Sequence, residues 1–325
     1  MVVGAAEEQG GGQDETPSRV VILGATGFVG RHVGAAFQAG GHQVLAVARR
    51  PAKIPASWRF FPADLANDGR DELLRLMDAE RPVAIVNAAG AAWSSSEGPL
   101  REGNLLLVEQ VLAALDAASC RPRLVHLGSM HEYEPQPVGT ALDERVPTRP
   151  VTAYGASKLL GSRAVLEAAA SGRADAVVLR LSNVIGTGTP TTSLLGSVAQ
   201  QLRKAAQTRE PAVVRLSPLR ASRDFVDARD TADAIVAAAL GPVGGQVINI
   251  GRGEATHVRV LVDLLIAASG MTVQVVENPG SAPRPSADPD WMRVDISAAR
   301  ELLGWSPRRG LEDAVRELWE TTTPG

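Results

Sequence analysis

The sequence predicts an α/β fold, a doubly wound parallel sheet with a smaller C-terminal α/β lobe. Short apolar runs alternate with longer stretches of helical periodicity, a pattern typical of strands buried on both faces and covered by helices. A chain of 325 residues, 45% of them hydrophobic, is long enough to bury a large core and an appended lobe. The apolar runs are 20–23, 44–47, 83–86, 124–127 and 176–181, and the helical stretches include 100–118 and 154–170.

Composition and pattern divide the chain into three parts. The first residues are rich in Gly, Glu, Gln and Asp, a composition that predicts disorder. After Asn183 the alternation loosens into a turn rich in Gly and Thr, a helix and a short strand near 212–216, and the apolar run at 246–250 then predicts a return to the sheet. The predicted parts are a disordered tail (1–17), a sheet domain (18–183, with 222–251 returning to it) and a lobe (184–221 and 252–325).

Charge and composition argue against several classes of function. The net charge of −3 leaves no electrostatic footprint for nucleic acid or a membrane surface. No segment has the apolar length of a membrane span, and the N-terminus lacks a basic flank with an apolar stretch, so we expect a cytoplasmic protein. The single Cys120 excludes an internal disulfide framework, and no metal site is expected.

The first predicted strand runs directly into a glycine-rich turn, GATGFVG, which an apolar helical pattern follows. In this order the first glycine allows a tight turn, the second lets the backbone approach a pyrophosphate, and the third lets the helix pack closely on the sheet. The pyrophosphate then meets the free N–H groups at the helix N-terminus. The pattern therefore predicts a Rossmann-type dinucleotide site. Its expected contacts in the turn are Gly24, Thr26, Gly27, Phe28, Val29 and Gly30.

The ends of the next two strands indicate which dinucleotide binds. Where an NAD site places an acidic residue for the ribose 2′-hydroxyl, this chain has Arg49 and Arg50. Two guanidinium groups suit a 2′-phosphate, which favours NADP(H), although arginines at such a place are often only solvated. After the third strand, Asp64 and Leu65 are expected to contact the cofactor. Asp64 would accept a hydrogen bond from the adenine amino group, or it would be a loop residue or helix cap.

Tyr154 and Lys158 are the residues that most strongly indicate chemistry. The chain has only two tyrosines and three lysines, and a spacing of four places these two side chains on one helical face. A fixed ammonium beside a phenol stabilises the phenolate, so we expect the pKa of Tyr154 to be lowered from about 10. Tyr154 would then be a general acid or base near neutral pH. Standing alone, the pair would equally suit an amphipathic surface helix.

Together these motifs resemble those of the extended short-chain dehydrogenase/reductase family, in the subgroup that acts on nucleotide-activated sugars. The resemblance covers roughly residues 18 to 320, and its motifs are specific in combination. The matching residues are Gly24-x-x-Gly27-x-x-Gly30, Asn87-Ala88-Ala89-Gly90, Ser129, Tyr154-x-x-x-Lys158, Arg180-Leu181-Ser182-Asn183-Val184, Arg223-Asp224-Phe225-Val226, Asn249-Ile250-Gly251, and Arg284-Pro285 leading to Leu302-Leu303-Gly304-Trp305.

The resemblance implies a role for each residue of the reaction site. Ser129 would hydrogen-bond the substrate carbonyl oxygen and share it with Tyr154, which delivers the proton. Lys158 would hold the nicotinamide ribose and keep the pKa of Tyr154 low. Asn104 resembles the family asparagine that orders its helix and a nearby water, with a cap or surface residue as the alternative. The cofactor contacts that the resemblance adds to the glycine turn are Asn87, Ala88, Ala89, Gly90, Asn104, Tyr154 and Lys158.

For the substrate, the resemblance implies a nucleotide diphosphosugar. Arg223 and Arg284 resemble the arginines that clamp the diphosphate, because a guanidinium binds phosphate through two hydrogen bonds. Asn183 would also contact the nucleotide sugar. His131 would contact the substrate or donate an additional proton, with a local hydrogen-bond partner as the alternative. Each arginine and Asn183 would otherwise be a polar surface residue.

One departure from the family pattern narrows the reaction. Family 4,6-dehydratases carry an Asp-Glu pair directly after the hydroxyl residue of strand five, where this chain has Met130 and His131, with Glu132 one place late. Dehydration is therefore disfavoured, and a preference for NADPH favours net reduction. The prediction is NADPH-dependent reduction of the keto group of a nucleotide-diphospho-4-keto-6-deoxysugar. Thymidine is the expected base, by analogy with GC-rich bacteria, whose Arg and Ala bias the chain shares.

Two other functions are compatible with the same fold, and two of the predicted helices indicate a dimer. A nucleotide-sugar epimerase would retain its cofactor, and a catalytically idle NADP-binding regulator would use the same fold. An intact set of Ser129, Tyr154 and Lys158 argues against the regulator. The helices at 100–118 and 154–170 carry apolar and small residues on more than one face, and family members bury this surface in a four-helix interface, so a homodimer is expected.

Overall fold

A computed structural model describes residues 17–50, 54–67, 69–91, 97–208, 212–278 and 289–322. Of the predicted disordered tail, all but Pro17 lies outside the described residues. Arg284, predicted to contact the substrate, lies outside them as well.

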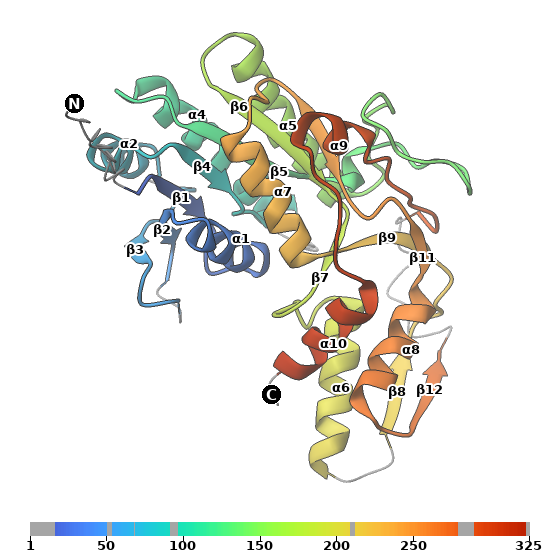
Figure 1. Cartoon of the computed structure of the whole chain (residues 1–325). Helices are drawn as coiled ribbons and strands as arrows, with labels where there is room; N and C mark the ends of the chain where they lie inside the picture. Colours follow the sequence, from blue (N-terminus) through green and yellow to red (C-terminus); the bar gives the residue numbers. More distant parts are fainter. Residues whose placement is uncertain are drawn as a thin grey trace, which may run out of the picture.

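A parallel seven-stranded sheet forms the centre of the molecule (Figure 1). Its strand order is β10-β6-β5-β4-β1-β2-β3, so the chain winds to one side through β1 to β3 and to the other side from β4 onward. The predicted doubly wound sheet is confirmed, and its topological switch point lies between β1 and β4. The strands are β1 (Arg19–Leu23), β2 (Gln43–Ala48), β3 (Arg59–Pro62), β4 (Ala84–Asn87), β5 (Arg123–Ser129), β6 (Ala176–Leu181) and β10 (Val247–Ile250).

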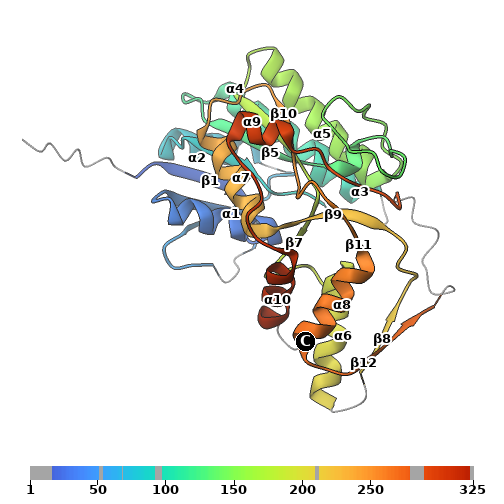
Figure 2. The same ribbon diagram turned by 45° about the vertical axis from the view of Figure 1, so that its right-hand side comes forward.

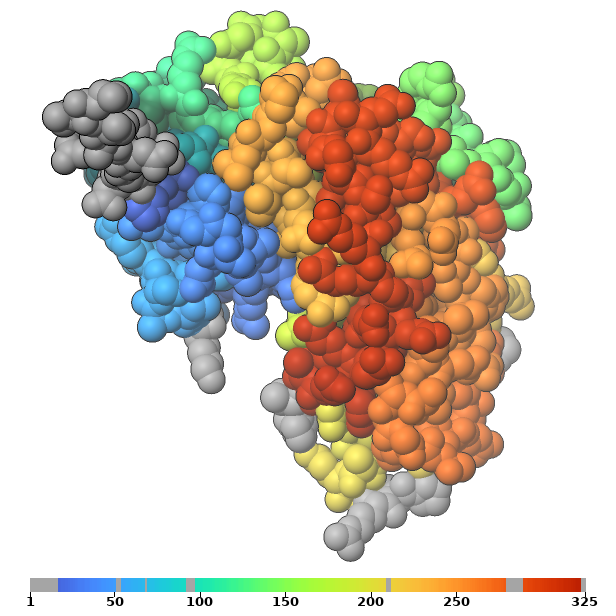
Figure 3. Space-filling model, viewed as in Figure 1, coloured from blue at the N-terminus to red at the C-terminus, as the bar shows by residue number. Residues whose placement is uncertain are grey.

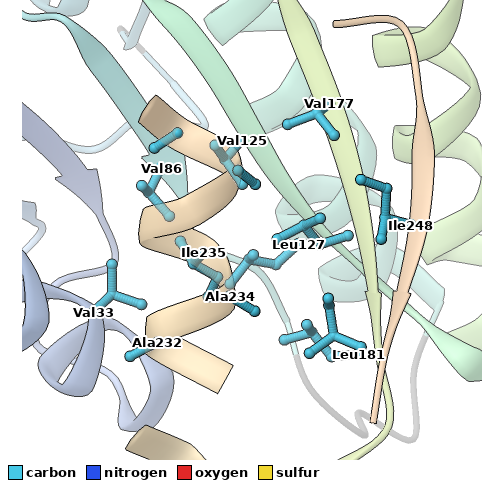
Figure 4. Packing of buried hydrophobic residues seen from close by; sticks show 14 of the residues in the cluster. Val33, Val86, Val125, Leu127, Val177, Leu181, Ala232, Ala234, Ile235 and Ile248 are labelled. Carbon is cyan, nitrogen blue, oxygen red and sulfur yellow. The ribbon is translucent and has the colours of Figure 1, made fainter. Parts of the chain in front are cut away.

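Helices cover both faces of the sheet because successive strand residues point to opposite sides and both sets are apolar. On one face α1 and α7 pack, and Figure 4 shows Ile235 of α7 lying over the strands that carry Val86 and Val125. On the other face α2, α4 and α5 enclose a second apolar cluster. The bounds are α1 (Phe28–Ala39), α2 (Gly69–Glu80), α4 (Leu107–Ala117), α5 (Ala153–Ala170), α7 (Ala228–Leu240) and, beside α7, α9 (Ser297–Leu303).

The helix predicted at 100–118 contains an irregular turn. It consists of α3 (Glu97–Arg101), the π-helical segment η1 (Glu102–Leu106) and α4, and the Leu107 amide donates to the Glu102 carbonyl five residues back. Such π-helical turns are frequent at functional sites. The widened turn brings the Asn104 carbonyl against Gly161 of α5, where any Cβ would clash with it. The glycine therefore sets how closely η1 and α5 approach.

In its described residues, the lobe consists of two small sheets and three helices around a separate apolar cluster. Figure 2 shows its helices side by side, away from the main sheet. Within 222–251, α7 and β10 join the layers of the main sheet, whereas β9 pairs with lobe strands. The lobe elements are β7 (Asn183–Ile185), β9 (Ser222–Asp227) and β11 (Ala255–His257) in one sheet, β8 (Ala212–Leu216) and β12 (Val273–Glu277) in the other, and α6 (Leu194–Thr208), α8 (Val258–Ser269) and α10 (Leu311–Thr321).

The surface is hollowed between the sheet domain and the lobe. Figure 3 shows this notch between the blue N-terminal elements and the red, orange and yellow surface of the lobe. Ligands of doubly wound sheets bind outside the carboxyl ends of the strands, near the switch point. Among the helices that the structure describes, none has the length and apolar character needed to cross a membrane.

The contact between η1 and α5 can be tested with a pair of glycine substitutions. Gly161→Ala is expected to lower the free energy of unfolding by about 1–3 kcal/mol, because the methyl group would press on the Asn104 carbonyl. Gly98→Ala in α3 meets no heavy atom of a described residue within 4 Å and should be neutral or stabilising by up to about 1 kcal/mol. Chemical denaturation measures both. Equal effects would contradict the close approach.

Candidate active site

The turn between β1 and α1 fits the diphosphate of a dinucleotide. Gly24 has a φ of 78°, and a Cβ at Gly30 would clash with the Gly24 carbonyl, so both positions require glycine. α1 begins after Gly27. Because glycine has no side chain that could cap the helix, no capping side chain occupies the first N–H groups of α1. The first turn of α1 carries no acidic residue that would repel an anion.

The segment after β4 lies directly against this turn. A Cβ at Gly24 would be 2.8 Å from the Cα of Ala89, so the two segments are in close contact. Asn87 is buried, and its side-chain oxygen accepts the Ala89 N–H at 3.2 Å. Asn87 therefore shapes the 87–90 turn from inside, and the backbone of Ala88, Ala89 and Gly90 borders the glycine turn.

Asn104 connects this segment to α5. Its amide accepts the Ala91 N–H at 3.1 Å and donates to the Ala91 carbonyl at 3.0 Å. It also donates to the Ser157 hydroxyl at 2.9 Å, and Ser157 donates in turn to the Tyr154 carbonyl at 2.8 Å. The fully buried Asn104 thus ties the segment after β4 to the helix that carries Tyr154, and the expectation that it orders its own helix and a nearby water stays a prediction.

The two arginines after β2 are exposed. Neither Arg49 nor Arg50 makes an ion pair or hydrogen bond with another described residue, so both guanidinium groups are available to a ligand. Asp64, also exposed, accepts the Ala66 N–H at 3.3 Å and the Asn67 side-chain amide at 3.0 Å. It therefore organises the turn after β3, and the adjacent Leu65 is buried in the core.

Ser129 and Tyr154 come together where the end of β5 meets the start of α5, and Lys158 lies buried one helical turn after Tyr154. Thr152 caps α5 by accepting the Gly155 N–H at 3.0 Å. Gly155 lies so close to the His131 carbonyl that any Cβ there would clash, which lets the first turn of α5 approach the end of β5. As a result, a hydrogen bond joins the side chains of Tyr154 and Ser129.

Burial shifts the pKa values of both residues of the Tyr-Lys pair. It raises the pKa of Tyr154 to about 12, against the opposing effect of the hydrogen bond to Ser129. Burial also lowers the pKa of Lys158 to about 8. The expected lowering of the Tyr154 pKa by Lys158 is therefore wrong, because desolvation of the phenolate outweighs any stabilisation by the ammonium. Tyr154 keeps its proton at neutral pH and is suited to donating it.

The residues after Ser129 replace the acid and base of a dehydratase. Met130 is buried in the core, and the His131 ring packs edge-on against the Tyr154 ring, with centroids 5.9 Å apart and an interplanar angle of 71°. His131 thus lies at the proposed reaction centre. The carboxylate of Glu132 points into the protein interior instead.

Glu132 has a structural role that the motif comparison missed. It ends η2 (Met130–Glu132), and its carboxylate accepts hydrogen bonds from the Ser129 N–H at 2.8 Å, the Ser162 hydroxyl at 2.9 Å and the Arg180 Nε at 2.8 Å. Its exposed fraction is 0%, so it cannot reach a substrate. The capping-box spacing of Ser129 and Glu132 could have predicted the hydrogen bond from the Ser129 N–H to Glu132. No local pattern predicts the contact with Arg180.

Two predicted substrate residues lie on neighbouring strands of the lobe. Asn183, on β7, donates its side-chain amide to the Asp224 carbonyl of β9 at 2.8 Å. It follows closely on Leu181, the β6 residue that pairs with Ser129. Arg223 lies half-buried on β9, the middle strand of its sheet. The structure therefore brings Asn183 and Arg223 to one sheet that adjoins the end of β5.

Comparisons with known proteins identify the family of the chain. A family model described as "NAD dependent epimerase/dehydratase family" matches residues 20–251. A dTDP-6-deoxy-L-talose 4-dehydrogenase (NAD(P)(+)) from Kitasatospora kifunensis is 44% identical over 313 residues, covering 95% of this chain and 97% of the relative.

Two solved structures share the fold. RMD from Pseudomonas aeruginosa, complexed with NADPH, has a TM-score of 0.78 and 22% identity, with 94% of this chain and 98% of that chain covered. UDP-glucose 4-epimerase from Thermus thermophilus, in complex with NAD, has a TM-score of 0.82 and 23% identity, with 93% and 98% covered. At these identities the two structures bear on the fold alone.

The raised pKa of Tyr154 can be measured directly, because the chain has only two tyrosines, Tyr133 and Tyr154. Burial raises the pKa of both to about 12. The ultraviolet absorption of phenolate should therefore stay flat as the folded protein is titrated past pH ~10, whereas the protein in denaturant should titrate near pH ~10. A Tyr133→Phe variant assigns the remaining signal to Tyr154. A transition near neutral pH in that variant would instead show that the pKa of Tyr154 is lowered, as the sequence predicted.

Proposed function

Because the chain belongs to the NAD dependent epimerase/dehydratase family, as its motifs predicted, we propose that it uses NADPH to reduce the 4-keto group of a nucleotide-diphospho-4-keto-6-deoxysugar, with dTDP as the carrier. The observation that carries this proposal is the hydrogen bond between Tyr154 and Ser129, next to Lys158. The 44% identical relative, named as a 4-dehydrogenase of a dTDP-6-deoxysugar, supports the substrate class. A 4-dehydrogenase acting in reverse reduces a 4-ketone.

Tyr154 is the proton donor of this reaction. Reduction of a ketone places negative charge on its oxygen, and a phenol that keeps its proton at neutral pH can neutralise that charge. The Ser129 hydroxyl, already bonded to the phenol, is placed to share the same oxygen and polarise the carbonyl. A donor and a polarising group at one oxygen suit the reductive direction.

The chain also supplies a fitting cofactor site. When bound, the nicotinamide supplies the hydride. The glycine turn and the N-terminus of α1 would hold the diphosphate, and Lys158, whose pKa of about 8 leaves it mostly charged at pH 7, would donate to the ribose hydroxyls. Arg49 and Arg50, exposed and without ion pairs among the described residues, would hold the 2′-phosphate of NADPH.

The lobe would bind the substrate, and one helical surface would form a dimer. Segments 184–221 and 252–325, the latter with Arg284, would bind the nucleotide diphosphate together with Asn183 and Arg223, which border the first segment. A homodimer would bury the outer surface of α4 and α5, on which Leu160 is 42% exposed.

The burial of Glu132 also bears on the alternative reactions. Elimination of water needs an acid and a base beside the hydroxyl residue, and the only carboxylate of the 129–132 segment is held in an internal ion pair. An epimerase would return its cofactor to the starting state, and a regulator would not turn over. Net consumption of NADPH therefore separates the proposed reductase from both.

Replacing the proton donor tests the mechanism. Tyr154→Phe keeps the ring and its contact with His131 but removes the proton, so turnover of a dTDP-4-keto-6-deoxysugar should fall by about 10²–10⁴ while NADPH binding is nearly unchanged. NADPH oxidation and a binding titration give the two readouts. Unchanged turnover would mean that another residue supplies the proton, and His131 would be replaced next.

The cofactor preference is tested by removing both arginines after β2. Arg49→Ala with Arg50→Ala should weaken NADPH binding by about 10–100-fold and leave NADH binding unchanged, because only NADPH carries the 2′-phosphate. The double variant Arg70→Ala with Arg75→Ala on α2 removes the same charge from an exposed surface and is the control. Equal affinity of the parent protein for the two cofactors would contradict the assignment.

A further inference from the structure

Glu132 joins the three elements that carry or support the proposed reaction site. From η2 its carboxylate accepts from Ser129 at the end of β5, from Ser162 of α5 and from Arg180 of β6. Ser162 lies one helical turn after Lys158, on the same face of α5. One side chain therefore fixes the polarising serine relative to the helix that presents Tyr154 and Lys158.

The surrounding structure keeps this carboxylate and its partner in place. A Cβ at Gly128 would lie 2.7 Å from the Glu132 Oε1, so glycine leaves the room that the carboxylate occupies. The Arg180 guanidinium stacks over the Tyr133 ring at 4.3 Å, and the Tyr133 hydroxyl donates to Asn249 at 2.8 Å. Both charges are thus held by contacts on several sides.

Stability alone does not explain such a pair. Glu132 is 0% exposed and Arg180 4% exposed. Removing two charges from water costs about as much as their attraction returns, and apolar replacements of buried pairs are often equally stable or more so. The buried carboxylate of Glu132 is better explained by its effect on a neighbouring ionisable group.

The group that the charge acts on is Lys158. Burial lowers the pKa of Lys158, and the negative charge of Glu132 opposes this effect. The other titratable groups close to it are His126 of β5 and Tyr154 of its own helix. The pKa of His126 is lowered by burial and by Lys158, so His126 is neutral at pH 7, and the raised pKa of Tyr154 leaves it neutral as well. Glu132, which is bonded to Ser162 one helical turn after Lys158, is therefore the carboxylate whose charge acts on this ammonium.

We propose that Glu132, with Arg180 as its counter-ion, is a positioning residue for the reductive site: its carboxylate fixes Ser129 against α5 and places a negative charge beside the helical turn that carries Lys158. The catalytic part rests on the proposed function. The effect on Lys158 does not, because it exists in the protein without substrate.

The effect is measured by the titration of Lys158 in Glu132→Gln. Glutamine can still accept from Ser129 and Ser162 but has no charge. With only three lysines in the chain, NMR of ¹³C-labelled lysine resolves Lys158 from Lys53 and Lys204. Lys158 should titrate about one pH unit lower than in the parent protein, because the ammonium has lost its counter-charge, while the other two lysines stay unchanged.

Asp230→Asn is the matched control. Asp230 is 1% exposed and pairs with Arg309, but it lies on α7, across the sheet from α5. It should cost stability without moving the Lys158 titration. An unmoved Lys158 in Glu132→Gln, or an equal shift in Asp230→Asn, would overturn the proposal. If Glu132→Gln does not fold, the double variant with Arg180→Gln leaves no unpaired charge and undergoes the same titration.

Turnover separates this inference from the proposed function. With a keto-sugar and NADPH, Glu132→Gln should lower kcat by about 10–100-fold and move the alkaline limit of activity to lower pH. The direction follows because loss of Glu132 lowers the pKa of both Lys158 and Tyr154, so each loses its proton earlier as pH rises. A shifted Lys158 titration in a protein that reduces no keto-sugar would refute the reductase and keep the charge effect. Parental turnover and pH profile in Glu132→Gln would refute the positioning role.

Discussion

The ion pair between Glu132 and Arg180 is the interaction on which the geometry of the site depends. Neither charge can be left without its partner in the interior, because an unpaired buried ion costs several kcal/mol. The ends of β5 and β6 and the middle of α5 are therefore held in one arrangement. In that arrangement the capped first turn of α5 lies against the backbone of η2, and Tyr154 reaches Ser129.

The same exclusion of water that makes the ion pair obligatory also decides the protonation of the site. Desolvation acts in opposite directions on an acid and a base, and it leaves Tyr154 with its proton and Lys158 close to losing one. A tyrosine in this state can donate a proton, and it would act as a base only if a nearby positive charge lowered its pKa. In the resting protein Tyr154 therefore holds the proton that the proposed reduction would use.

Periodicity and spacing in the sequence were sufficient to predict the sheet, its helices and the placement of Tyr154 and Lys158 on one helix, because each of these depends on residues that are near in sequence. The site also depends on contacts that local patterns do not encode. Arg180 lies 48 residues from Glu132, and only the parallel pairing of β5 with β6 brings the two together. The pKa of Tyr154 was predicted in the wrong direction because a motif specifies the neighbouring charge and not the depth of burial.

The π-helical turn at Asn104 has a consequence for how such a site can change by insertion and deletion. A turn closed by a bond from Leu107 to Glu102 holds one residue more than an α-helical turn. Deleting a single residue from 102–106 would restore a regular helix but rotate everything before it by about 100° relative to α4. Asn104 would then leave both Ala91 and Ser157, so the length of this helix is tied to the contact between the cofactor turn and α5.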